Sequence, residues 1–387
     1  MQALRLCREL QERGVDVKVI TWGKLWHPKR GECNGVKFTR LRSIVNIVAD
    51  LPALLKRQKA AAPVKIVYND KQEVTTTMNS KVWSGMILRY KLVFYNLYIY
   101  LYTRRSQFDI LHVHMMEWPA FTAVRVGKLL KKQVVIKDST MNGIFNLLRY
   151  PDGVSKQQEV IEYANFVAMT QMIRNNFLKA GISPEKISMI PNGIPVTVPE
   201  PKQSWKNKVV FVGNLTQQPA KGIDVLLAAW TTVIESFPSA TLTIVGEGDI
   251  LAYTRHTESL SISGSVSFVG KQQNTKRILQ ESDVFVLPSR REGMSNALME
   301  AMMCAMPVVV TDVSGSQDLV QNGVSGLIVP PAEIAGLAAA IIRMLSNPAE
   351  AITMGKKAYE SITTKCDMRK VGNLYYDLYQ KILSPHP

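Results

Sequence analysis

Short apolar runs rich in valine and isoleucine recur along nearly the whole chain, and stretches with helical spacing of apolar residues separate them. The first series lies at residues 15–21, 108–114, 134–138, 164–170 and 186–194, and the second at residues 209–215, 241–249, 266–270, 283–289, 307–312 and 325–331. Such runs are typical of strands buried on both faces, and helices that connect them place the strands in parallel sheets. The pattern therefore predicts an α/β fold.

The length of the chain and one polar segment indicate two domains. At 387 residues the chain is about two ordinary domains long. Around residues 195–205, between the two series of strands, the sequence PVTVPEPKQSWKNK is rich in proline and polar residues. We therefore expect two doubly wound, Rossmann-like domains, residues 1–195 and 196–365, with ligands bound at the carboxyl ends of the strands in a cleft between the domains.

The composition excludes several classes of protein. Apolar residues make up 46% of the chain and charged residues 20%, which argues against a disordered or collagen-like chain. The four cysteines lie far apart and include no C-x-x-C pair, so we expect neither a zinc site nor a disulfide framework. A reducing, cytoplasmic setting fits this cysteine usage best.

The net charge of +16 lies in the first half of the chain. Residues 1–195 hold 30 Lys and Arg against 14 Asp and Glu, whereas residues 196–387 hold 17 of each. This excess predicts an anionic partner, and the charge alone leaves open nucleic acid, a phosphorylated substrate or an acidic membrane surface. Residues 92–102 form an apolar run about half as long as the ~20 residues that span a bilayer. We expect this run to pack on a sheet or to lie at the inner face of the cytoplasmic membrane, making peripheral contact without crossing it.

The segment from 289 to 312, SRREGMSNALMEAMMCAMPVVVTD, carries the most specific chemistry. Glu292 follows a strand, Gly293 permits a tight turn, and the helix formers that follow predict a helix from about Met294, with Glu300 about two turns along it. The amides of Gly293, Met294, Ser295 and Asn296 would then face a phosphate. Glu300 could accept hydrogen bonds from a pair of ribose hydroxyls, and Glu292 could contact whatever lies beyond the phosphate. Two isolated glutamates would instead be solvated, or would stabilise the helix dipole.

The motifs of the whole chain, in their order and spacing, resemble those of glycosyltransferase family 4. In the second half these are VVFVGNL, AKGIDVLLAAW, TLTIVGEGD, VSFVG, DVFVLPSRREG and QNGVSGLIVPP, and in the first half FDILHVH and ANFVAMTQMIRNNFLKAGISPEKISMIPNGI. The family consists of retaining enzymes that use sugar nucleotides. The resemblance implies the GT-B fold, with two Rossmann-like domains facing across a cleft and a C-terminal helix, residues 366–387, that returns to the first domain.

The resemblance implies a role for each matching residue. Lys221 would neutralise the diphosphate of the departing nucleotide, and Glu292 would bind the transferred sugar, so these two are the catalytic candidates. Glu300 would bind the ribose. Gly213 would let its loop approach the phosphates, and Asn214 stands where the family usually has an arginine. The backbone of Val269 and Gly270 would hold the base.

The first half departs from the family pattern in two places. Family members carry a histidine after the strand that matches residues 134–138, whereas this chain has Lys137, Asp138 and Ser139, so Asp138 or Ser139 is the candidate contact for the acceptor or the sugar. His112 and His114 are further candidates for the cleft, or structural histidines on a strand. Family members also begin with a strand and a glycine-rich loop that this sequence lacks, and we therefore expect a truncated start, with ~20 residues preceding it.

The resemblance to this family implies a retaining hexosyltransferase that moves a sugar from a nucleoside diphosphate, with UDP favoured, to a hydroxyl of a surface polysaccharide or lipid-linked glycan. Because no Asp-x-Asp occurs in the chain, we expect neither a metal nor another cofactor. Two alternatives stay open: a GT-B sugar-nucleotide epimerase, and a non-catalytic subunit that binds sugar nucleotides. A nucleic-acid binder would explain the charge but not the motifs.

Overall fold

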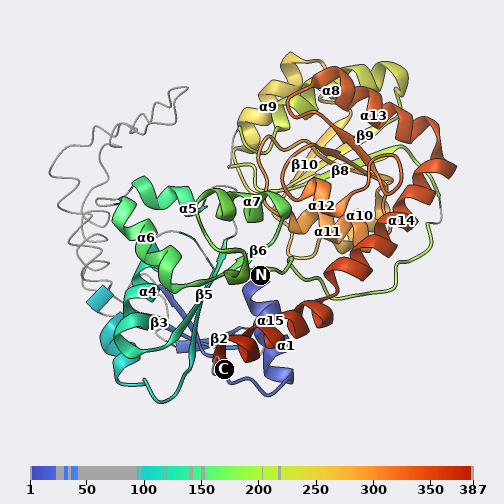
Figure 1. Ribbon diagram of the computed structural model, residues 1–387. Helices are drawn as coiled ribbons and strands as arrows, with labels where there is room; N and C mark the ends of the chain where they lie inside the picture. Colours follow the sequence, from blue (N-terminus) through green and yellow to red (C-terminus); the bar gives the residue numbers. More distant parts are fainter. Residues whose placement is uncertain are drawn as a thin grey trace. The chain divides into compact units, whose positions relative to one another are not determined.

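The chain forms two compact units in the computed structural model (Figure 1). The structure describes residues 2–22, 30–33, 36–41, 94–95, 97–114, 116, 118–138, 143–149, 153–202, 204–216 and 219–384. The first unit consists of Met1–Ala168, Asn175–Ser188 and Gly372–Pro387, and the second of Met169–Arg174 and Met189–Val371. The chain therefore passes between the units more than once, and its last segment belongs to the first unit.

The second unit is built on a six-stranded sheet in the order β10-β9-β8-β11-β12-β13. Its strands are β8 (Lys208–Val212), β9 (Thr241–Val245), β10 (Val266–Gly270), β11 (Val284–Leu287), β12 (Val308–Thr311) and β13 (Leu327–Val329). Neighbouring strands of this sheet run parallel, and β11 and β12 are buried along their whole length, as valine-rich runs predict. The strand order reverses between β8 and β11, so the chain leaves these neighbours in opposite directions. A doubly wound sheet binds its ligand at this point.

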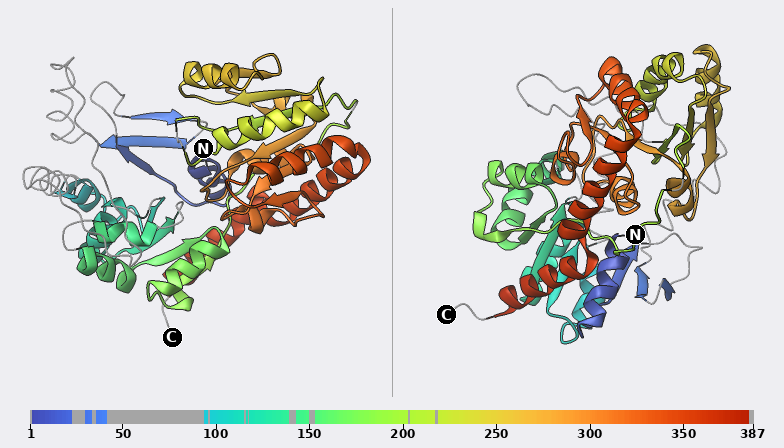
Figure 2. Two further views of the ribbon diagram at one scale, coloured as in Figure 1. Left: turned by 90° about the horizontal axis from the view of Figure 1, so that it is seen from above. Right: turned by 90° about the vertical axis from the view of Figure 1, so that its right-hand side faces the viewer.

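Helices flank the sheet of the second unit (Figure 2). They are α8 (Ile223–Ser236), α9 (Ile250–Ser259), α10 (Lys276–Glu281), α11 (Asn296–Met303), α12 (Ser316–Leu319), α13 (Ile334–Ser346) and α14 (Pro348–Cys366). α8 packs against α13, and α11 packs against α14. The apolar face of α8 includes the fully buried Trp230, whose indole nitrogen donates to Ser265 Oγ at 2.9 Å. This packing fixes the loops that follow β8 and β11.

The described residues of the first unit form two sheets. The larger has the order β4-β5-β6-β7, formed by β4 (Ile110–Val113), β5 (Gln133–Asp138), β6 (Asn165–Ala168) and β7 (Ile187–Met189). The smaller has the order β1-β3-β2, formed by β1 (Val19–Trp22), β2 (Arg30–Cys33) and β3 (Val36–Leu41). β2 pairs with β3 in antiparallel fashion, so the expectation of parallel pairing throughout is wrong here. The exposed Arg30, Glu32 and Lys37 give these strands a polar character, unlike strands buried on both faces.

Helices of the first unit come from both ends of the chain. They are α1 (Gln2–Glu12), α4 (Trp118–Leu130), α5 (Gly143–Asn146), α6 (Gly153–Tyr163), most of α7 (Gln171–Lys179) and most of α15 (Met368–Leu383). Two 3-10 turns, η1 (Leu147–Arg149) and η2 (Pro184–Lys186), also belong to this unit. α1 lies beside α15 (Figure 1), and Arg13, which directly follows α1, donates from Nε to Asn373 Oδ1 on α15 at 2.8 Å.

The apolar segment of the first half is described only in part. Residues 94–95 and 97–102 are helical, whereas residues 81–93 lie outside the described part of the chain. Over the ranges that the structure describes, no helix combines the length and the apolar character needed to cross a bilayer.

Candidate active site

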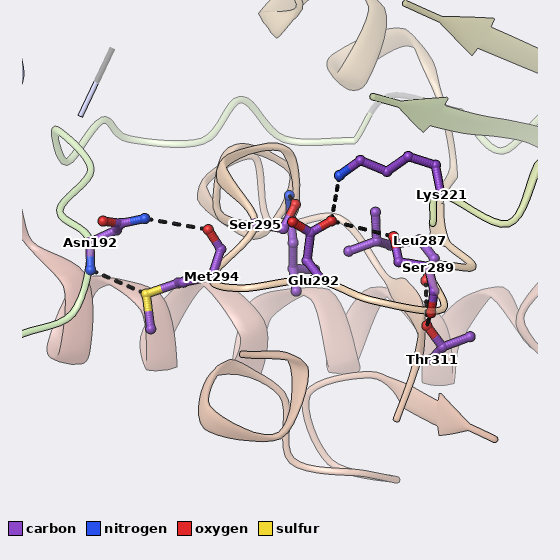
Figure 3. A network of polar contacts seen from close by, with 9 residues as sticks. Asn192, Lys221, Leu287, Ser289, Glu292, Met294, Ser295 and Thr311 are labelled. Carbon is purple, nitrogen blue, oxygen red and sulfur yellow. Dashed lines mark hydrogen bonds and ion pairs between the residues drawn. The ribbon is translucent and has the colours of Figure 1, made fainter. Parts of the chain in front are cut away.

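Two charged side chains meet at the point where the strand order of the second unit reverses. Lys221 lies in the loop between β8 and α8, and Glu292 in the loop between β11 and α11. Lys221 Nζ is 2.6 Å from Glu292 Oε2, and the two side chains are only 13% and 15% exposed (Figure 3). The structure thus brings together the two catalytic candidates named from the sequence, as a largely buried ion pair.

Hydroxyl groups hold the backbone that carries Glu292. Ser289 Oγ donates to Glu292 Oε2 at 3.3 Å. Thr311, at the end of β12, donates its hydroxyl to the carbonyls of Ser289 and Leu287, at 2.5 and 3.3 Å (Figure 3). Ser289 and Thr311 are buried, so these bonds form away from water, where a missing partner is costly. Neither hydroxyl was predicted from the sequence.

A left-handed glycine brings the Lys221 loop against β11. Gly222 is the N-cap of α8 with φ of 65°, a conformation that side chains other than glycine rarely adopt. A Cβ atom at this position would overlap the carbonyl oxygen of Pro288. Glycine is therefore what allows the loop after β8 to lie on the end of β11.

α11 starts later than the sequence predicts. Its first residue is Asn296 and its N-cap is Ser295, whose Oγ accepts from Leu298 N at 3.4 Å. The predicted start at Met294 is therefore wrong by two residues, because serine is a strong N-cap and ends the preceding loop. Glu300 is consequently the fifth residue of the helix, just over one turn from its start rather than two.

The residues before α11 are fixed from other parts of the unit. Asn192 donates its side-chain amide to Met294 O at 3.3 Å, and its backbone amide points to Met294 Sδ at 3.2 Å (Figure 3). Gly315 packs on Gly293 so closely that a Cβ atom would overlap the carbonyl oxygen of Gly293. These contacts set the direction of the first-turn amides of α11. Amides at a helix start, with the helix dipole, attract anions.

Glu300 is held by a residue that the sequence analysis missed. Thr275, the N-cap of α10, donates its hydroxyl to Glu300 Oε2 at 3.1 Å. One carboxylate oxygen is thereby oriented by the protein. The arrangement is suited to binding paired hydroxyl groups.

Gly213 and Asn214 form the turn that follows β8. Gly213 N donates to Val245 O at 2.9 Å, and a Cβ atom at Gly213 would come within 2.6 Å of the Phe211 ring. Asn214 Oδ1 accepts from the backbone amide of Thr216 at 2.9 Å and from its hydroxyl at 2.7 Å. The asparagine thus shapes the turn with its side-chain oxygen.

Val269 and Gly270 lie at the carboxyl end of β10, where the register of the strand shifts. Val269 is exposed, and its carbonyl accepts from Gln272 Nε2 at 2.7 Å. The carbonyl of Gly270 accepts from Gly246 N at 3.0 Å. Both carbonyls are therefore engaged within the protein.

The candidates of the first half form a separate group inside the first unit. His112 and His114 stand on β4 and its end with their rings 4.4 Å apart, and His112 Nδ1 is 2.6 Å from the hydroxyl of Tyr379 on α15. Asp138 ends β5 and is buried. Ser139 lies outside the described residues.

Burial and neighbouring positive charge determine the protonation of this group. Burial, then His114 and Lys137, hold the pKa of His112 well below its usual value. Burial, followed by the charge of Lys137, lowers the pKa of His114 to about 3. Burial lowers the pKa of Lys137 to about 8. At neutral pH both imidazoles are therefore uncharged, and His112 contacts the last helix through Tyr379.

Acidic, histidine and cysteine side chains do not gather in groups of three or more that could hold a metal ion anywhere in the described ranges.

Comparison with known proteins gives matches over both halves of the chain. The family described as "Glycosyltransferase Family 4" matches residues 1–198, and the family described as "Glycosyl transferases group 1" matches residues 206–347. The first match alone spans more than half of the chain.

Individual relatives match shorter parts. N-acetyl-alpha-D-glucosaminyl L-malate synthase of Bacillus anthracis is 30% identical over 37% of this chain and 38% of its own length. UDP-Gal:alpha-D-GlcNAc-diphosphoundecaprenol alpha-1,3-galactosyltransferase of Escherichia coli is 29% identical over 51% of this chain and 55% of its own length. The crystal structure of Anabaena Alr3699/HepE in complex with UDP superimposes with a TM-score of 0.66 at 18% identity, over 74% of this chain and 82% of that chain, which indicates a common fold.

Proposed function

The chain belongs to glycosyltransferase family 4 and has the GT-B fold, and on that premise we propose that it is a retaining hexosyltransferase that uses a nucleoside-diphosphate sugar. The acceptor is a hydroxyl group of a surface polysaccharide or of a lipid-linked glycan. UDP is the favoured nucleotide.

One observation carries this proposal. At the point where the strand order of the second unit reverses, an ammonium group, the start of a helix and two carboxylates lie on the segments that follow β8 and β11. Lys221 and Glu292 pair at 2.6 Å, and Glu300 lies about one turn into α11. The diphosphate would lie at the amides before and within the first turn of α11, with Lys221 beside it. Glu300 would bind the ribose, and Glu292 the sugar.

The chemistry follows from these placements. The bond between the anomeric carbon and the diphosphate oxygen breaks, and a bond forms between that carbon and the acceptor oxygen. The acceptor proton passes to the departing diphosphate, so no separate base is required. Lys221 and the helix amides stabilise the negative charge that develops on the diphosphate, and Glu292 stabilises the positive charge on the sugar. Entry of the acceptor on the face that the diphosphate leaves retains the anomeric configuration, and no metal takes part in this scheme.

The choice of UDP is supported by related structures. Anabaena Alr3699/HepE has been crystallised with UDP and with UDP-glucose, and it shares the fold of this chain. The Escherichia coli relative carries a UDP-sugar in its name.

An exposed apolar face on the helical residues 94–95 and 97–102 supports a lipid-linked acceptor. Tyr95, Ile99 and Tyr102 recur at the spacing of one helix face and are 57%, 61% and 44% exposed. Arg104 and Arg105 follow after one threonine, and each guanidinium lies over a tyrosine ring. Exposed tyrosines next to arginines suit the headgroup layer of an anionic membrane, as in the peripheral contact expected from the charge of the first half.

Two measurements test the proposal together. Thermal unfolding with a panel of nucleotide sugars should give the largest rise in Tm with one UDP-sugar, because a ligand that binds the folded state stabilises it. Release of UDP should then increase when a glycan acceptor is added. Binding without turnover for any acceptor would favour a non-catalytic sugar-nucleotide subunit, and binding of no nucleotide would refute the proposal.

A further inference from the structure

Arg290 connects the two loops that carry Lys221 and Glu292. It lies two residues before Glu292, and its guanidinium makes a bidentate contact with Asp224, with Nη1–Oδ1 at 2.7 Å and Nη2–Oδ2 at 2.6 Å. Nη1 also donates to the carbonyl of Pro219 at 2.9 Å. A single side chain thus holds both the start of α8 and the loop before it.

The backbone repeats this connection. The amides of Arg290 and Arg291 donate to the carbonyl of Ala220, at 2.8 and 3.3 Å. Ala220 directly precedes Lys221, so the position of the Lys221 backbone is set by the segment that carries Glu292. We call residues 219–221 together with Arg290 and Asp224 the strap.

Charge and geometry both stabilise the contact between Arg290 and Asp224. Asp224 is in the first turn of α8, where the helix dipole favours a negative charge. Hydrogen bonding to Arg290 lowers the pKa of Asp224, and the same contact raises the pKa of Arg290. An exposed ion pair with a single hydrogen bond contributes little to stability. An arginine that binds a carboxylate through two hydrogen bonds and a carbonyl through a third restricts the motion of both segments.

Lys221 has a long, flexible side chain, and its own ion pair with Glu292 cannot hold it once a ligand competes for the ammonium. Binding of a diphosphate requires Lys221 to turn from the Glu292 carboxylate towards the phosphate oxygens. The strap keeps the Lys221 backbone in place during this exchange.

We propose that Arg290 is a positioning residue: through Asp224 and the carbonyl of Pro219 it holds the Lys221 ammonium within reach of the diphosphate of the nucleotide sugar. This inference rests on the proposed function. Arg290 is then a second cation of the site, and it acts through Lys221 without contacting the ligand.

The test is a double-mutant cycle on UDP affinity, measured by calorimetry on the full chain. Arg290→Ala should raise the Kd for UDP by about tenfold, because a misplaced ammonium loses part of a charge-assisted contact. In the Lys221→Ala background the same substitution should change the Kd less than about twofold, because the residue through which it acts is gone. Arg343→Ala is the matched control, since Arg343 pairs with Glu350 at the same distance of 2.6 Å elsewhere in the unit. It should leave the Kd unchanged.

Conservative variants separate positioning from folding. Arg290→Lys keeps the charge but not the bidentate fork, and should recover less than half of the lost affinity. A melting temperature for Arg290→Ala close to that of Arg343→Ala would show that the fold is intact.

Two results would overturn the inference. One is an unchanged Kd in Arg290→Ala. The other is an equal loss with and without Lys221, which would mean that Arg290 contacts the ligand or supports the fold in general. If the unaltered chain fails to bind UDP, the proposed function fails instead, and the two failures are therefore distinguishable.

Discussion

The pairing of Lys221 with Glu292 predicts an unusual consequence of neutralising the glutamate. Glu292→Gln should tighten the binding of UDP. In the chain as it stands, the diphosphate must draw the ammonium from a carboxylate 2.6 Å away, in a place where both side chains are at most 15% exposed. Neutralising the carboxylate removes the attraction between two unit charges, which amounts to about 1 kcal/mol at a separation of a few ångströms even when water screens it fully. Removing the charge should therefore lower the Kd for UDP about fivefold.

Calorimetric titration with UDP measures this change. The matched control is Glu350→Gln, which removes the same charge from a pair of the same length with Arg343. It should leave the Kd as it is. Sugar transfer by Glu292→Gln should meanwhile fall by at least about a hundredfold, because the carboxylate that we propose to face the anomeric carbon is lost. Weaker or unchanged UDP binding by Glu292→Gln would refute the reasoning that the pair competes with the diphosphate.

Three further predictions concern other parts of the molecule. Glu300→Ala should raise the Kd for UDP about tenfold through loss of the ribose contact, and an unchanged Kd in the same titration would place the ribose elsewhere. The pKa of His114 is lowered to about 3 in the folded chain, so the unfolded chain binds more protons between pH 6.5 and 3, and stability should fall as the pH drops through this window. Urea unfolding should show a flatter profile for His114→Gln, and identical profiles would contradict the shift. Asp283 is buried, contacts Lys202 Nζ at 2.6 Å and accepts from the amides of Lys206 and Lys208, so Asp283→Ala should lower the free energy of unfolding by about 3 kcal/mol. A loss below about 1 kcal/mol in urea unfolding would contradict the role assigned to this carboxylate.

Much of the fold was predictable because strands buried on both faces leave a clear pattern. Each of the eleven valine- and isoleucine-rich runs overlaps a strand of the structure. β2 and β3 were missed because their sequences, RGEC and VKFTRL, mix charged and apolar residues. The start of α11 was placed too early because a good helix former, Met294, precedes Ser295. The capping bond of Ser295, which ends the loop, depends on local geometry.

The candidate site was predictable only in part. Lys221 and Glu292 are 71 residues apart, and their proximity was expected from family motifs rather than from spacing. Thr275, which holds Glu300, and Asp224, which holds Arg290, lie 25 and 66 residues from their partners. Hydrogen bonds of this kind depend on which loops the sheet order brings together. Nothing in the local sequence of either partner marks them.

The central claim concerns where the nucleotide binds, and a crystal structure of the chain with UDP tests it. The account predicts phosphate oxygens within hydrogen-bonding distance of Lys221 Nζ and of the amides at the start of α11, with the ribose hydroxyls on Glu300. A nucleotide bound away from α11, or a diphosphate held by a divalent ion in place of Lys221, would contradict it.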